Sequence, residues 1–227
     1  MSGSIQDRIQ RLSEDYDTEI VSRYHSLQPN LVQSKEKLRS LSGEMAVSSI
    51  SAENTIETIA VAGSYARLEA SALSDFDVLV VLNDDSDQVR AHRTVLDFIA
   101  SKGYPTPNPK GVFAQPVTVE KLRSVAGGTH EEYGDLSRRI LLLLESRPVY
   151  KPDRYNSLMK ALIDTYASDV VEQTGRKTKN FVFLLNDIIR YFRTICVNYQ
   201  YTKEVTEWGK WPIRNIKLRS QPGLNVF

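Results

Sequence analysis

The stretch from Thr58 to Leu82, TIAVAGSYARLEASALSDFDVLVVL, restricts the fold of this chain more than any other part of the sequence. Its first apolar run ends at Gly63-Ser64, and its second begins directly after Asp75-Phe76-Asp77. Unbroken apolar runs of this length are typical of strands covered on both faces, which predicts strands over residues 57–62 and 75–82. Because side chains alternate along a strand, Asp75 and Asp77 should lie on the same face.

Two neighbouring carboxylates on one face repel each other, and a divalent cation between them relieves that repulsion. The Gly63-Ser64 turn can offer backbone N–H groups and a hydroxyl to a phosphate. A phosphate-binding turn beside a pair of metal-binding carboxylates is typical of phosphoryl or nucleotidyl transfer. This chemistry is our leading hypothesis from the residues alone.

Composition excludes several other classes of protein. The net charge of +1 indicates no strongly basic or acidic surface overall. Cys196 is the only cysteine, which excludes a disulfide framework and a cysteine-based zinc site. No apolar stretch is long enough to span a membrane, and the N-terminus lacks the apolar core of a signal peptide, so we expect a cytoplasmic protein without a membrane partner.

Hydrophobic periodicity predicts helices on both sides of these strands. We expect one helix over about 4–20 and another from about Asn30 to Met45, with Pro29 as an interruption between them. Further helices are expected over 64–69, 88–101, 129–147, 152–166 and 178–201, and a third strand over 111–119. We therefore predict an α+β chain with an N-terminal helical segment (1–54), a core (55–148) and an all-helical C-terminal domain (149–227). Homo-oligomerisation through the N-terminal helices is possible.

The motif GSYAR followed by SDFD resembles the nucleotidyltransferase superfamily related to DNA polymerase β. Within it, the motif is most similar to the branch that contains PII-uridylyltransferase, glutamine-synthetase adenylyltransferase and their bacterial relatives. The resemblance implies a small mixed sheet with flanking helices. It also implies transfer of a nucleoside monophosphate from a nucleoside triphosphate to an acceptor hydroxyl on a protein, a nucleotide or RNA, with Mg²⁺ or Mn²⁺ as cofactor. Bacterial members often act in regulation or in defence against phage.

The same resemblance implies a role for individual residues. Gly63 and Ser64 would bind the β- and γ-phosphates, and Asp75 and Asp77 would be catalytic metal ligands. Arg67 would reach a phosphate, although an ion pair with Glu69 or Asp75 explains it equally well. Lys110, in the loop before the third predicted strand, is a weaker phosphate candidate.

One departure from the family pattern concerns the third catalytic carboxylate, which relatives usually carry on a later strand. No Asp or Glu occurs between Phe98 and Val119, and Glu120 is the first acid available. Either Glu120 is that catalytic acid, or an acid from the helical half is, or the catalytic set is incomplete. An incomplete set would leave a nucleotide-binding sensor rather than an enzyme.

Two basic clusters lie in the C-terminal part. Asn186, Arg190 and Arg193 share one helix face, where the arginines either bind the triphosphate or pair with Asp187 and the acids of 131–135. The final segment carries Trp208 and Trp211 among basic residues, which suggests either RNA binding or a solvated basic tail. Its basic residues are Lys210, Arg214, Lys217 and Arg219.

Overall fold

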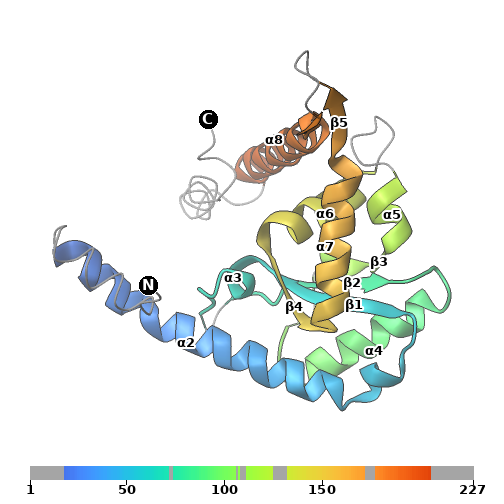
Figure 1. Cartoon of the computed structure of the whole chain (residues 1–227). Helices are drawn as coiled ribbons and strands as arrows, with labels where there is room; N and C mark the ends of the chain where they lie inside the picture. The colour runs from blue at the N-terminus through green and yellow to red at the C-terminus, as the bar shows by residue number, and fades with distance from the viewer. Residues whose placement is uncertain are drawn as a thin grey trace.

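The computed structural model describes residues 18–71, 74–105, 107, 111–124, 132–171 and 177–205. Its centre is a four-stranded sheet in the order β3-β2-β1-β4 (Figure 1). The strands are β1 (Ile56–Ala62), β2 (Val78–Leu82), β3 (Val117–Thr118) and β4 (Ser146–Tyr150). Strand β1 pairs antiparallel with β2 and with β4, while β2 and β3 run parallel. This mixed sheet with flanking helices confirms the predicted α+β class.

Seven α-helices and two 3₁₀ turns of the described residues accompany the sheet. The helices are α2 (Thr18–Ala46), α3 (Gly63–Ala66), α4 (Gln88–Ser101), α5 (Val119–Ser124), α6 (Tyr133–Glu145), α7 (Pro152–Tyr166) and α8 (Val182–Val205). The 3₁₀ turns are η1 (Ser49–Ala52) and η2 (Val112–Ala114), and a hairpin joins β5 (Ser168–Val171) to β6 (Lys177–Asn180). None of the described helices has the length and hydropathy needed to cross a membrane.

Alternation along β2 divides the core into two layers. Val78, Val80 and Leu82 pack with residues of α2, η1 and α4, whereas Leu79 and Val81 pack with residues of α5, α6 and α7. All five β2 residues are buried, as the unbroken apolar run predicts. Helix α8 packs on α6 through a smaller cluster that includes Ile140 and Phe192.

Helix α2 corrects the prediction that Pro29 separates two helices. The helix runs through Pro29 without a break, and Figure 1 shows its N-terminal half projecting away from the sheet. A proline inside a helix removes one backbone hydrogen bond and costs about 3 kcal/mol or more, so the packing of the turns that follow must offset this cost. Leu41 and Met45 provide that packing, since both are buried in the first core layer. Most of the first predicted helix (4–20) lies outside the described residues.

The C-terminal region is not all helical, which corrects a second prediction. Residues 146–150 form β4, so the predicted boundary at 148 falls inside a strand of the sheet. The β5–β6 hairpin precedes α8, which begins at Val182 rather than near Thr178. Helix α7 does span Pro152–Tyr166 as predicted, and its Leu158 and Leu162 share a core layer with β1 and β2.

Candidate functional site

At one edge of the sheet, β1 ends between the first residues of β2 and β4. The Ala62 N–H donates to the Asp77 carbonyl at 2.8 Å, and Ala62 is also the register partner of Ser146 in β4. Since neighbouring strands lie about 4.8 Å apart, the backbones of Asp77 and Ser146 stand on opposite sides of Ala62, about 10 Å from each other. Gly63, where α3 begins, therefore leaves the sheet between them.

Asp75 and Asp77 share a face, as their spacing predicts, although β2 itself begins only at Val78. Phe76 between them points the other way and is 2% exposed. It packs against the rings of Tyr65 and Tyr104, with centroids 4.9 and 4.4 Å away. This aromatic anchor fixes the extended segment, so both carboxylates are directed into one cavity.

Gly63 brings the α3 turn close to Asp77. Its φ of +62° is a left-handed conformation that side chains disfavour, and a Cβ there would lie 3.0 Å from the Asp77 Oδ2. The missing Cβ therefore allows the backbone to approach the carboxylate. Ser64 follows in the first turn of α3 and lines the same cavity.

The cavity has a volume of about 720 Å³, which suits a ligand of nucleotide size. One wall comes from the Gly63-Ser64 turn and the two aspartates, and a second from Gly111, Val112 and Phe113. The opposite wall consists of one face of α6 and one face of α8, each with residues spaced by four. These residues are Tyr133, Ser137, Leu141 and Glu145 on α6, and Tyr191, Ile195 and Tyr199 on α8.

Arg67 lies in this cavity between two carboxylates. Its Nη1 is 2.5 Å from the Glu145 Oε2, and its Nε donates to the Glu69 Oε1 at 2.6 Å. Burial lowers the pKa of Arg67, but the hydrogen bonds and charges of the two glutamates outweigh burial and raise that pKa above its ordinary value. The predicted pair with Glu69 is therefore present, and Glu145 is a partner that the sequence did not reveal.

The cavity is rich in acid. Glu69, Asp75, Asp77 and Glu145 line it, and Arg67 is already paired with two of them. No group of three or more His, Cys, Asp or Glu side chains among the described residues is arranged to hold a metal ion. Mg²⁺, however, commonly takes only one or two carboxylates from the protein and its remaining ligands from substrate phosphates and water. Asp75 and Asp77 fit an ion that binds together with a nucleotide.

Glu120 does not lie at this site. The parallel pairing of β2 and β3 covers only Val81–Val117 and Leu82–Thr118, and Phe113 precedes it in the 3₁₀ turn η2, where it lines the same cavity as Asp77. Glu120 lies on the other side of β3, exposed in the first turn of α5, and does not line the cavity. The expected third strand is only two residues long, and the residues before it that line the cavity, Gly111, Val112 and Phe113, include no acid.

The two C-terminal arginines also lie apart from the cavity. The Arg190 Nη1 binds the Asp187 Oδ1 at 3.0 Å, and Asp187 is fully buried. Arg139, also fully buried, approaches the other Asp187 oxygen at 3.0 Å. Arg193 is exposed. Helix α8 thus presents tyrosines to the cavity and uses Arg190 in an ion-pair network, which is the alternative that the sequence left open. Lys110 and the basic segment after Val205 lie outside the described residues.

Two polar groups of the helical wall were missed in the sequence. Tyr191 is 5% exposed, and burial, followed by the charge of Glu145, raises the pKa of its hydroxyl. The Ser137 Oγ is buried and has no hydrogen-bond partner among the described residues. The signal for this wall in the sequence was the spacing of Tyr133, Ser137 and Glu145 by multiples of four, which places them on one face of a helix.

One family model matches part of the chain. Residues 45–106 match the family model described as the nucleotidyltransferase domain, of the polymerase β-like superfamily. The matched segment contains Gly63, Ser64, Arg67, Asp75 and Asp77, and it ends before β3. No curated protein and no solved structure matches the chain significantly.

Proposed function

We propose that this chain transfers a nucleoside monophosphate from a nucleoside triphosphate to an acceptor hydroxyl, with Gly63, Ser64, Asp75 and Asp77 as the core of the site. One observation carries the proposal: Gly63 adopts a left-handed conformation, and the turn that begins there lies close to the Asp77 carboxylate. A Cβ added at Gly63 would lie only 3.0 Å from the Asp77 Oδ2. Such a turn beside a metal-binding carboxylate suits a substrate in which phosphates and a divalent cation arrive together.

Each residue then has a defined task. Asp75 and Asp77 would hold Mg²⁺ or Mn²⁺, which when bound supplies charge neutralisation at the phosphates. The turn at Gly63 and Ser64 would donate hydrogen bonds to the terminal phosphates. Arg67 would exchange one of its glutamate partners for a phosphate oxygen, because a guanidinium binds either group with the same geometry.

The identity of the acceptor forms the finer part of the proposal. The GSYAR and SDFD motifs resemble those of uridylyl- and adenylyltransferases that modify proteins, which favours a protein acceptor over a nucleotide or RNA. A role in bacterial regulation or defence follows from the same resemblance.

The test is calorimetric titration with each of the four nucleoside triphosphates and Mg²⁺, together with an assay of pyrophosphate release. We expect Asp75→Ala and Asp77→Ala each to abolish metal-dependent binding and turnover. Glu120→Ala is the matched control, because it removes an exposed acid outside the cavity and should leave both unchanged. Full activity in both aspartate variants would show that the site is elsewhere.

A nucleotide sensor without turnover is the second candidate, and it is favoured because the described cavity residues that precede β3, Gly111, Val112 and Phe113, include no acid. Glu145 is the one buried acid of the described cavity wall, but it lies on the β4 side and binds Arg67. Tight binding of Mg²⁺ and nucleotide without pyrophosphate release, across protein and RNA acceptors, would support the sensor. Pyrophosphate release that depends on an acceptor would exclude it.

A further inference from the structure

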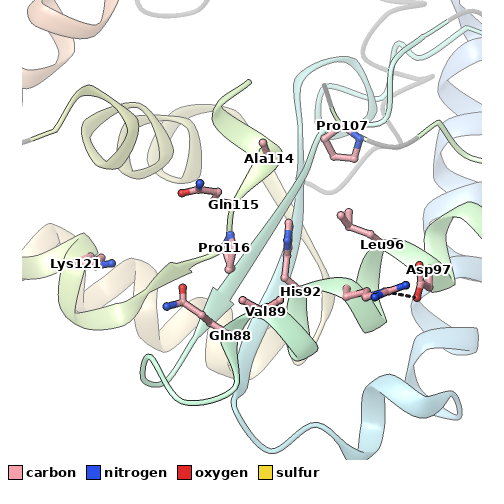
Figure 2. A pocket seen from close by; sticks show the side chains of 11 residues that line it. Gln88, Val89, His92, Leu96, Asp97, Pro107, Ala114, Gln115, Pro116 and Lys121 are labelled. Atoms are coloured by element: carbon pink, nitrogen blue, oxygen red, sulfur yellow. Dashed lines mark ion pairs between the residues drawn. The ribbon is translucent and has the colours of Figure 1, made fainter. Parts of the chain in front are cut away.

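A second cavity, of about 850 Å³, lies between α4 and the segment that leads from η2 into β3 (Figure 2). It shares no described lining residue with the cavity that holds Asp75 and Asp77. Turn η2 separates the two, since Val112 and Phe113 line the first cavity and Ala114 lines the second. A ligand here would therefore occupy a site different from the proposed nucleotide site.

His92 is the central polar group of this cavity. Figure 2 shows its ring rising from α4 between Pro116 and Leu96. The side chain is 8% exposed, and its Nε2 is buried with no hydrogen-bond partner among the described residues. Burial, and then the charge of Arg138, lower the pKa of His92, so the imidazole is neutral at pH 7. A buried polar atom without a partner is costly, and a ligand that supplies the partner recovers that cost.

The rest of the lining indicates an uncharged ligand. The cations of the wall have acidic partners, since Arg93 lies 3.7 Å from Asp97 and Lys121 lies 3.8 Å from Asp85. The remaining lining is apolar or carries an amide. The apolar residues are Val89, Leu96, Pro107, Ala114 and Pro116, and the amides are those of Gln88 and Gln115. Largely apolar walls with a few polar groups are typical of small-molecule sites.

We propose that this cavity binds a small uncharged molecule with an apolar body and a hydroxyl or amide group that hydrogen-bonds with His92. The apolar body of the ligand packs against the leucine and proline side chains, and its polar group supplies the partner that the buried Nε2 of His92 lacks among the described residues. The site goes beyond the proposed nucleotide chemistry, and its occupancy is measurable without any nucleotide.

Phenol and toluene are suitable probes, because they have the same size and differ only in the hydroxyl group. Binding of each to the full chain is measured by saturation-transfer NMR. We expect the ratio of phenol to toluene affinity to fall about tenfold in His92→Phe, because the variant keeps a ring of similar size and loses the hydrogen-bonding nitrogens. An unchanged ratio would overturn the role of His92.

A second variant tests the location of the site independently of His92. Val89 is 80% exposed at the cavity wall, so Val89→Trp should fold and fill the cavity. Both probes should lose their saturation-transfer signal with this variant. Val197→Trp, at a 58% exposed position of α8, is the matched control and should bind both probes like the unmodified chain. Equal probe binding by the Val89 and Val197 variants would overturn the proposal, as would no binding of either probe to the unmodified chain.

Discussion

Replacing Gly63 by alanine tests how the turn and the carboxylate are brought together. The new residue would have to adopt a φ of +62°, which costs an L-residue about 1–2 kcal/mol. Its Cβ would also lie 3.0 Å from the Asp77 Oδ2, a contact that forces the carboxylate to move by some tenths of an ångström. We expect the free energy of unfolding to fall by about 1–2 kcal/mol. Turnover of the nucleoside triphosphate should fall about 100-fold, because small misplacements of reacting groups are that costly.

Gly103→Ala provides the matched control. Gly103 has a φ of +78°, but its Cβ would meet no atom within 4 Å. The control variant should therefore lose a similar free energy of unfolding and keep full nucleotide binding. Urea denaturation gives the stability of each variant, and calorimetry with Mg²⁺ and nucleotide gives the affinity.

A double-mutant cycle with Asp77→Ala separates the two costs of the Gly63 substitution. Without the Asp77 carboxylate the close contact disappears, so Gly63→Ala should destabilise the double variant less than the unmodified chain. A coupling free energy of about 0.5 kcal/mol or more is expected for groups in contact. Strict additivity, or a Gly63→Ala variant with unchanged nucleotide affinity, would refute the close approach of turn and carboxylate.

Further predictions concern the buried charges and the pH dependence of stability. Asp187→Ala should lower the free energy of unfolding by about 3–5 kcal/mol in urea denaturation, because it removes a fully buried carboxylate that pairs with the fully buried Arg139. Glu145→Gln should cost about 1–2 kcal/mol in the same assay, because the 5% exposed carboxylate holds Arg67. Glu69→Gln, at a 50% exposed side chain, should cost less than about 0.5 kcal/mol. Burial, followed by the hydrogen bond to Asp187, raises the pKa of Tyr166 in the folded state. The contribution of Tyr166 to the free energy of unfolding should therefore be fully present below about pH 10 and decline above it. Tyr166→Phe should flatten that decline. The pKa of His92 is lowered in the folded state, so stability should persist above about pH 6.5 and decline as the pH falls below it, and His92→Phe should remove this dependence.

The elements nearest the candidate site were predictable because local chemistry specifies them. Helix α4 was expected over 88–101 and is found over Gln88–Ser101, between an acidic turn and the left-handed Gly103 that ends it. Val78–Leu82 was recognisable as a doubly covered strand from its unbroken apolar run. The common face of Asp75 and Asp77 required only the alternation of an extended chain.

Strand β4 was not predictable, because its sequence, SRPVY, resembles the end of a helix followed by a proline stop. Pro148 is nevertheless compatible with the sheet, since β4 is an edge strand that pairs with β1 alone. Because β4 was not predicted, the position of Glu145 next to Arg67 could not be predicted from the sequence either. That contact joins residues 78 positions apart, and only the tertiary fold brings them together.

The prediction of a third strand over residues 111–119 was wrong for a related reason. Residues 111–119 look like a strand because Val112, Val117 and Val119 favour extended structure. In the fold, Val112–Ala114 form a 3₁₀ turn, and Val117–Thr118 alone pair with β2. The Arg138 Nε donates to the Val112 carbonyl at 2.8 Å, so a side chain from α6 takes the place of a strand partner. A distant side chain that takes a backbone carbonyl away from the sheet cannot be recognised from the neighbouring sequence.

The short turn η2 contributes residues to the walls of both cavities. Because Ala114 lines one cavity while Val112 and Phe113 line the other, a ligand that shifts η2 in one cavity also shifts lining residues of the other. Thermodynamic linkage then works in both directions: if phenol alters the affinity for a nucleotide by some factor, the nucleotide alters the affinity for phenol by the same factor. A substitution that makes η2 more rigid would weaken both effects on affinity, and each cavity would still bind its own ligand.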